Sequence, residues 1–177
     1  MKKQKALFID RDGIINVDHG YVYKIEDFEF TKDIFTLLHL FVAQGYLLFI
    51  VTNQSGIGRE YYSLEAFETL NQWLMECFQA KGIEIQEIEY CPHTPHENCK
   101  CRKPLTGMIE NILTKYPVDL QHSWMIGDKQ SDMDLALNAH IGSSIAINPS
   151  KLENATYSFS SIKACAKYLE ENKDKII

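Results

Sequence analysis

Aspartates follow two short apolar runs of the chain, in positions where a buried strand would end in a polar loop. Asp10 and Asp12 come after ALFI in the segment FIDRDG, and Asp128 comes after WMI in MIGDKQSD. Three carboxylates held close together repel one another unless a cation lies between them. Magnesium prefers oxygen ligands and keeps positions open for water and a phosphate. The pattern therefore predicts a magnesium site that acts on a phosphorylated ligand.

Thiols and imidazoles gather in a second segment, YCPHTPHENCKCRKP. Cys91, His93, Cys99 and Cys101 follow the spacing C-x-H-x5-C-x-C, with His96 as an alternative to His93. Four such ligands form the closed tetrahedral set that structural zinc prefers, whereas a catalytic zinc usually keeps an open position. We therefore expect a structural zinc.

Two basic residues come directly after this cysteine loop. Arg102 and Lys103 follow Cys101 without a spacer. A metal that holds the loop would also fix the direction of these two side chains, and cations ordered in advance bind phosphate better than mobile ones. The remaining thiols, Cys77 and Cys165, fall in predicted helices and are expected to pack in the core.

Apolar runs and helical periodicity alternate along the whole chain. Strands are predicted at 6–10, 46–52, 83–91, 123–127 and 143–147, and helices at 34–45, 64–81, 106–116, 131–140 and 160–173. Segments 11–31 and 53–59 are predicted to be loops. The helix at 64–81 should start at the cap Ser63 and end before Gly82. Its expected buried residues are Leu64, Phe67, Leu70, Leu74 and Phe78.

This alternation predicts an α/β fold, a Rossmann-like parallel sheet with helices on both faces. Ligands of such sheets bind beyond the carboxyl ends of the strands, where the aspartates are placed. The 177 residues contain no obvious linker or repeat, so one domain over 1–177 is expected, with the zinc loop at 91–101.

Composition excludes several other classes of protein. The net charge of −6 argues against sequence-independent nucleic-acid binding. No apolar run approaches the length of a membrane span, and the basic start MKKQK is not followed by a signal-peptide core. Clustered, metal-binding cysteines are typical of a reducing compartment, so we expect a cytoplasmic protein.

Four motifs occur in the order DRDG, TNQSG, CRKP and GDKQSD, and together they resemble the motifs of haloacid dehalogenase-like phosphohydrolases. The resemblance implies that Asp10 is the nucleophile that forms an aspartyl-phosphate. It implies that Asp12 is the acid that protonates the leaving oxygen and then the base that activates water. Mg²⁺ would be held by Asp10, the Asp12 carbonyl and Asp128, with Asp132 as a supporting acid.

Further roles follow from the same resemblance. Thr52, Asn53 and Lys103 would stabilise the transferring phosphoryl group. Some members of this family have a minimal cap and hydrolyse the C7 phosphate of D-glycero-D-manno-heptose 1,7-bisphosphate. Three segments of the chain are similar to segments of these members: NVDHGYV, TNQSGIGR and GDK. These members supply ADP- or GDP-heptose precursors for lipopolysaccharide. The implied substrate-binding residues are Asp18, His19, Gly20, Tyr21, Gln54, Ser55, Arg102 and Lys129.

The expected partner is therefore a small phosphorylated sugar, bound by a monomer. A histidinol-phosphatase is the alternative substrate assignment, because the zinc loop is short for the heptose enzymes and RKPLTGM lacks a proline often found there. A signalling domain phosphorylated on aspartate is the alternative from another class, but such domains lack the acid two residues after the nucleophile. The anomer of the heptose stays open.

Overall fold

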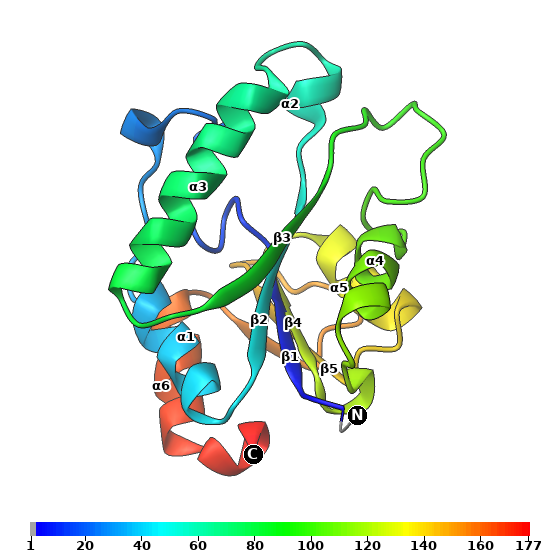
Figure 1. The fold of residues 1–177 in the computed structure, drawn as a ribbon. Coiled ribbons are helices and arrows are strands. Elements are labelled where there is room, and N and C mark those ends of the chain that lie inside the picture. Colours follow the sequence, from blue (N-terminus) through cyan, green and yellow to red (C-terminus); the bar gives the residue numbers. More distant parts are fainter. Residues whose placement is uncertain (1–2) are drawn as a thin grey trace.

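The strands form one six-stranded parallel sheet in the order β3-β2-β1-β4-β5-β6 (Figure 1). The computed structural model describes residues 3–177. The strands are β1 Ala6–Ile9, β2 Leu47–Asn53, β3 Ile85–Cys91, β4 Trp124–Gly127, β5 Ser143–Ile147 and β6 Tyr157–Phe159. The predicted parallel sheet is confirmed.

Helices cover both faces of this sheet, as the alternation predicted. They are α1 Ile34–Ala43, α2 Ser55–Gly58, α3 Leu64–Ala80, α4 Gly107–Lys115, α5 Gln130–Asn138 and α6 Ile162–Glu171, with 3₁₀ turns η1 Ile25–Asp27, η2 Leu120–His122 and η3 Lys173–Ile176. In Figure 1, α1, α3 and α6 lie on one side of the sheet and α4 and α5 on the other. The described part of the chain contains no helix that is long and apolar enough to cross a membrane.

The central strands are apolar on both faces because helices cover both. Leu7 and Ile9 of β1 pack in the cluster beneath α1, α3 and α6, whereas Ala6 and Phe8 pack in the cluster beneath α4 and α5. All four side chains are fully buried. A continuous apolar run of this kind is what a parallel strand between two helical layers requires.

Helix α3 shows how the sequence defines one of these layers. Ser63 caps it, because its Oγ accepts a hydrogen bond of 3.1 Å from the backbone N–H of Ala66. Phe67, Leu70, Leu74 and Phe78 are buried as predicted. Leu64 is 41% exposed, so that prediction was wrong. Leu64 is the first residue of the helix, and the core cluster on this face contacts α3 only from Leu70 onward.

Two short elements were missed by the sequence analysis. Segment 53–59, predicted as a loop, contains the single helical turn α2, and β6 extends the sheet beyond β5. A four-residue helix and a three-residue strand are too short to produce a periodic pattern. The long loop 11–31 is present, with only η1 and isolated bridges such as that between Asp12 and Asn16.

The order of the strands creates a crevice beside β1. The chain passes from β1 to β2 and β3 on one side, and β4 to β6 then fill the other side. Loops that leave β1 and β4 therefore diverge, and ligands of open α/β sheets bind at such a switch point. Asp10 follows β1 and Asp128 follows β4, and the Asp10 N–H donates to the Ile126 carbonyl at 3.0 Å. The fold thus brings both acids to one crevice.

Candidate active site

A buried lysine links two of the acids at the carboxyl end of the sheet. The Nζ of Lys103 lies 2.7 Å from Oδ1 of Asp10 and 2.7 Å from Oδ1 of Asp132, and it donates to the Val51 carbonyl at 2.9 Å. Although burial opposes a charge on this lysine, the carboxylates of Asp10 and Asp132 raise its pKa. The two acids therefore favour the charged form of Lys103 inside the site.

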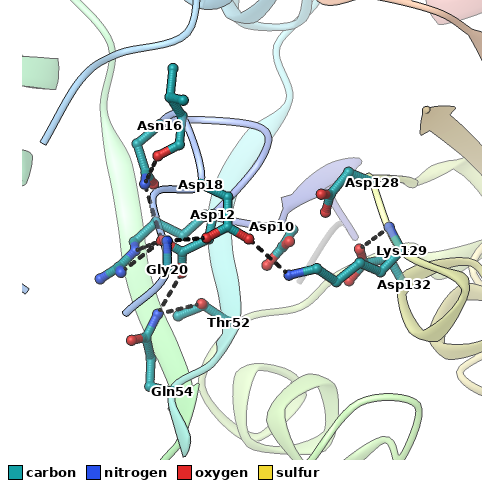
Figure 2. Close-up of polar contacts among 12 residues, drawn as sticks. Asp10, Asp12, Asn16, Asp18, Gly20, Thr52, Gln54, Asp128, Lys129 and Asp132 are labelled. Atoms are coloured by element: carbon teal, nitrogen blue, oxygen red, sulfur yellow. Dashed lines mark hydrogen bonds and ion pairs between the residues drawn. The ribbon is translucent and has the colours of Figure 1, made fainter. Parts of the chain in front are cut away.

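Asp128 completes a group of three acids around this lysine. Asp10, Asp128 and Asp132 each offer an oxygen within 4.8 Å of the others. Figure 2 shows Asp128 and Asp132 on one side of Asp10, and Asp12 on the opposite side. The sequence analysis treated Asp132 only as a supporting acid, yet it is fully buried and also accepts the backbone N–H of Lys129 at 3.1 Å.

The environment of these carboxylates fits a divalent cation. Burial raises the pKa of Asp10 well above its ordinary value, and the nearby Asp132 raises it further despite Lys103. Burial and Asp132 also raise the pKa of Asp128. The buried Oδ1 of Asp128 has no hydrogen-bond partner among the described residues. Lys103 and the nearby Lys129 therefore do not fully offset the negative charge, and a bound Mg²⁺ would favour the ionised acids.

Gly13 shows how closely the loop after β1 approaches Asp128. Its φ is +93°, and an added Cβ would lie 2.2 Å from Oδ2 of Asp128. Both the backbone conformation and the lack of space require glycine at the end of the DRDG motif.

Asp12 is held in a separate hydrogen-bond network. Its Oδ1 accepts from Nη2 of Arg11 at 2.9 Å and from Nδ2 of Asn16 at 3.0 Å, and its Oδ2 accepts from Nε2 of Gln54 at 3.0 Å. Arg11 is fully buried and also donates to the Val22 carbonyl at 2.6 Å. Arg11 and Asn16 were not predicted as site residues. The Arg between the two aspartates was the available signal, but sequence alone does not show that it points inward.

The side chain of Asn53 holds the backbone of Lys103. Its Oδ1 accepts the Lys103 N–H at 3.0 Å, and its Nδ2 donates to the Lys103 carbonyl at 3.4 Å. The two residues lie 50 positions apart in the chain. This contact helps to hold the lysine beside Asp10. Because the side chain of Asn53 is bound to Lys103, its backbone N–H is the group predicted to donate to phosphate.

A polar cavity of about 300 Å³ lies next to these networks and contains most of the predicted substrate-binding residues. Across it, Nζ of Lys129 lies 3.4 Å from Oδ2 of Asp18. His19 lines a neighbouring hollow instead, where its Nε2 lies 3.1 Å from Glu29. The predicted residues that line the cavity are Asp12, Asp18, Gly20, Tyr21, Asn53, Gln54, Ser55, Arg102 and Lys129.

The cysteine loop brings together three sulfur atoms. Cys91, Cys99 and Cys101 lie within 4.8 Å of one another, and the Sγ atoms of Cys91 and Cys101 are 2.8 Å apart. Burial raises the pKa of the Cys91 thiol, so a bound cation would be needed to favour its thiolate. His93 is not part of this group, because its Nδ1 faces Oε1 of Glu97 at 3.4 Å.

Comparison with known proteins identifies relatives of the chain. A family model described as HAD-hydrolase-like matches residues 100–146. The chain is 46% identical over 170 residues to a D-glycero-alpha-D-manno-heptose-1,7-bisphosphate 7-phosphatase of Campylobacter jejuni, a match that covers 96% of this chain and 98% of the relative. It is 49% identical over 154 residues to a D-glycero-beta-D-manno-heptose-1,7-bisphosphate 7-phosphatase of Helicobacter pylori, covering 85% and 89%.

A solved structure resembles the fold closely. The crystal structure of a D,D-heptose 1,7-bisphosphate phosphatase from B. bronchiseptica, complexed with magnesium and phosphate, has a TM-score of 0.83 and 25% sequence identity. The alignment covers 96% of this chain and 99% of that one. The two relatives in sequence and this crystal structure are thus all named as heptose 1,7-bisphosphate phosphatases.

The acidic cluster leads to a prediction for Asp128→Asn. The raised pKa values of these acids mean that folding favours their protonated forms, so the stability they contribute at low pH is lost as the pH rises through those values. At pH 8 the ionised acids should therefore destabilise the metal-free protein. The substitution removes one repelling charge. We expect the metal-free variant to melt roughly 2–4 °C higher at pH 8, the shift that about 1 kcal/mol gives in a chain of this length.

Calorimetry between pH 4 and pH 8, with and without Mg²⁺, measures this effect. The difference from the native protein should shrink toward pH 4, and added Mg²⁺ should stabilise the native protein but not the variant. Asp27→Asn, which changes an exposed acid in η1, is the matched control. Equal stabilisation of Asp128→Asn and the native protein by Mg²⁺ would exclude Asp128 as a ligand.

Proposed function

Since the chain belongs to the heptose-1,7-bisphosphate 7-phosphatase family of haloacid dehalogenase-like hydrolases, we propose that it releases the C7 phosphate of D-glycero-D-manno-heptose 1,7-bisphosphate. The product would be the 1-phosphate, ready for activation by a nucleotide. The observation that carries the proposal is the group formed by the buried Asp10, Lys103 and Asp132 and the half-buried Asp128 beside a polar cavity. It occurs in a chain of which 96% matches 98% of a relative.

Asp10 is proposed as the nucleophile. One of its carboxylate oxygens attacks phosphorus, the bond from phosphorus to the C7 oxygen breaks, and an aspartyl-phosphate forms. Asp12 gives its proton to the departing oxygen and then takes a proton from the water that attacks the aspartyl-phosphate. Phosphate leaves and both carboxylates return to their starting state. The hydrogen-bond network around Asp12 supports separate roles for Asp10 as nucleophile and Asp12 as acid and base, because it holds Asp12 without a contact to Lys103.

Charge compensation is the second requirement, because a phosphate dianion repels a carboxylate nucleophile. Lys103, 2.7 Å from Asp10, is placed to neutralise the transferring group, and Thr52 and the Asn53 N–H would donate to its oxygens. Mg²⁺, held by Asp10, Asp128 and the Asp12 carbonyl, would supply further positive charge to the phosphoryl oxygens. Asp132 holds Lys103 in place from the opposite side.

The cavity supports recognition of a sugar with a second phosphate. Lys129 and Arg102 are proposed to bind the distal part of the substrate, while Asp18 accepts hydrogen bonds from sugar hydroxyls. Gly20, Tyr21 and Ser55 line the same space. The ion pair between Lys129 and Asp18 would open when the substrate supplies its own anion and hydroxyls.

Zinc is proposed to hold the cysteine loop. Cys91, Cys99 and Cys101 provide three sulfur ligands, and His93 would complete the tetrahedron by turning its ring from Glu97. Lys103 follows two residues after the loop's last cysteine, so the metal would stabilise the direction from which that lysine enters the site. Such thiols require a reducing compartment, and we place the enzyme in the cytoplasm as one domain that acts as a monomer.

Steady-state kinetics on a substrate panel test the proposed activity. We expect kcat/KM for heptose 1,7-bisphosphate to exceed the values for fructose 1,6-bisphosphate and histidinol phosphate by at least about tenfold, because the cavity offers groups for a sugar and a second phosphate. Both heptose anomers belong in the panel. A higher kcat/KM for histidinol phosphate would overturn the heptose assignment and favour the alternative substrate.

Asp10→Asn tests the covalent mechanism. The amide has the shape of the carboxylate but is a poor nucleophile, so we expect kcat to fall by more than about 10³-fold and the acid-stable phosphoprotein to disappear. Rapid quenching with labelled p-nitrophenyl phosphate measures the phosphoprotein. Asp12→Asn is the informative partner, because it should still form the phosphoprotein from an ester whose leaving group needs no proton. Turnover that persists in Asp10→Asn would exclude this aspartate as the nucleophile.

Cys99→Ser tests the role of zinc. The native protein should contain about one tightly bound zinc and still require added Mg²⁺, whereas the variant should lose zinc, melt at a lower temperature and turn over more slowly. Cys77→Ser, outside the cluster on α3, is the control and should retain zinc. Full activity of a native protein that contains zinc but no Mg²⁺ would contradict a purely structural role.

A further inference from the structure

Tyr62 begins a chain of buried hydrogen bonds that ends at two proposed catalytic residues. Its hydroxyl lies 2.5 Å from Oε1 of Gln54, and Nε2 of Gln54 lies 3.0 Å from Oδ2 of Asp12 and 2.8 Å from Oγ1 of Thr52. Tyr62 is 7% exposed, Gln54 3% and Thr52 fully buried. Figure 2 shows Gln54 beneath Thr52 and directed toward Asp12.

The chemistry of the groups determines the direction of each bond. Asp12 has to keep its own proton for the leaving oxygen, so its Oδ2 must accept from Gln54 in the protonated state as in the ionised state. The NH₂ end of Gln54 therefore faces Asp12 and its carbonyl faces Tyr62. The phenol of Tyr62 therefore donates. If the amide turned over, its oxygen would face the Asp12 carboxylate while its NH₂ group met the phenol. The phenol can accept as well as donate, but it is the stronger donor, so its bond to the Gln54 carbonyl adds to the preference that Asp12 sets for this orientation.

The same orientation affects Thr52. Its Oγ1 accepts the second N–H of Gln54, so the hydrogen of its own hydroxyl is free to point to another acceptor. A hydroxyl that must donate to the phosphoryl oxygens is useful only if its hydrogen points outward. Gln54 therefore orients an acid and a hydroxyl donor at once, although the sequence placed it among the substrate-binding residues.

We propose that Tyr62 is a positioning residue of the reaction, which acts by holding the Gln54 amide in the orientation that orders Asp12 and Thr52. The proposal rests on the proposed function only in that Asp12 and Thr52 act on a phosphate monoester. Tyr62 needs no contact with the substrate for this role. It lies outside the four sequence motifs, in the loop that follows α2.

The position of the Tyr62 ring is itself well defined. The ring stacks on that of Tyr23, with centroids 4.9 Å apart and an angle of 11° between the planes. On α2, an added Cβ at Gly56 would lie 2.1 Å from the ring. Only glycine therefore lets the backbone of α2 pass so close to Tyr62. These contacts hold the hydroxyl toward Gln54 without help from its hydrogen bond.

Tyr62→Phe removes the hydroxyl and keeps these packing contacts. We compare kcat/KM for a simple alkyl phosphate and for p-nitrophenyl phosphate, because this ratio reports the steps up to departure of the leaving group. An alkoxide needs a proton from Asp12 far more than a nitrophenolate does. We expect a loss of about tenfold for the alkyl phosphate, the size of one buried hydrogen bond, and less than about threefold for the aryl phosphate.

A double-mutant cycle separates positioning from general structure. Gln54→Met, similar in volume and without the amide, should reduce kcat/KM for the alkyl phosphate by about 10²-fold. Adding Tyr62→Phe to it should cost less than about twofold, because the residue through which Tyr62 acts is gone. Tyr23→Phe, which removes the hydroxyl of the stacked partner, is the matched control and should behave like the native protein.

Equal losses for the two esters, or a tenfold loss that persists beside Gln54→Met, would overturn the positioning role. Melting temperatures accompany each variant, and the cycle remains valid if Tyr62→Phe is less stable. Because both assay substrates are simple esters, the result does not depend on the heptose. A native protein that cleaves them but not heptose 1,7-bisphosphate would refute the proposed substrate and leave this test intact.

Discussion

The buried ammonium group of Lys103 is the interaction on which the site depends. It lies 2.7 Å from both Asp10 and Asp132, and its side chain is 2% exposed. Buried charges persist in proteins only when they are paired, and breaking such a pair typically costs about 3–5 kcal/mol. The lysine permits the fold to bury two acids, but Asp128 then adds negative charge that Lys129 offsets only in part. Without a bound cation the site is therefore short of positive charge.

Several distant parts of the chain position this one lysine. Asn53, at the end of β2, binds both the backbone N–H and the carbonyl of Lys103. The last residue of the cysteine group, Cys101, lies two positions before this lysine. The backbone N–H of Gly58 on α2 donates to the Pro92 carbonyl at 2.9 Å, which joins α2 to the cysteine loop. A zinc ion bound there would therefore stabilise more than a loop, because the same loop contacts α2 and leads to Lys103.

Asp10 and Asp12 are two residues apart, yet they belong to different networks. Asp10 faces Lys103 and the other buried acids, whereas Asp12 accepts bonds from Arg11, Asn16 and Gln54. This separation suits two carboxylates with the different tasks proposed for them, attack on phosphorus and exchange of protons. Tyr62 belongs to the second network, so the segment from 52 to 62 contains both the proposed phosphate ligand Thr52 and the residue proposed to orient the acid.

Local patterns in the sequence were sufficient for the sheet, the long helices and the residues that end the strands. Apolar periodicity predicts these elements, and the motifs around Asp10, Thr52, Lys103 and Asp128 have characteristic residue types at short spacing. Elements of three or four residues, α2 and β6, carry no such pattern and were missed. The exposed Leu64 was misassigned for a related reason, because helical periodicity does not show where a helix passes beyond its core.

What the sequence by itself determined, then, was the parallel sheet, and it supplied the set of candidate reactive residues that the sheet carries. Only the tertiary structure decided which of these residues meet. Asp132 became a full partner of Lys103, His19 lies outside the main cavity, and Arg11, Asn16 and Tyr62 joined the network of Asp12. The physical reason is that these contacts are hydrogen bonds and ion pairs of a few ångströms between segments far apart in the chain. Their existence depends on side-chain directions that no local spacing specifies.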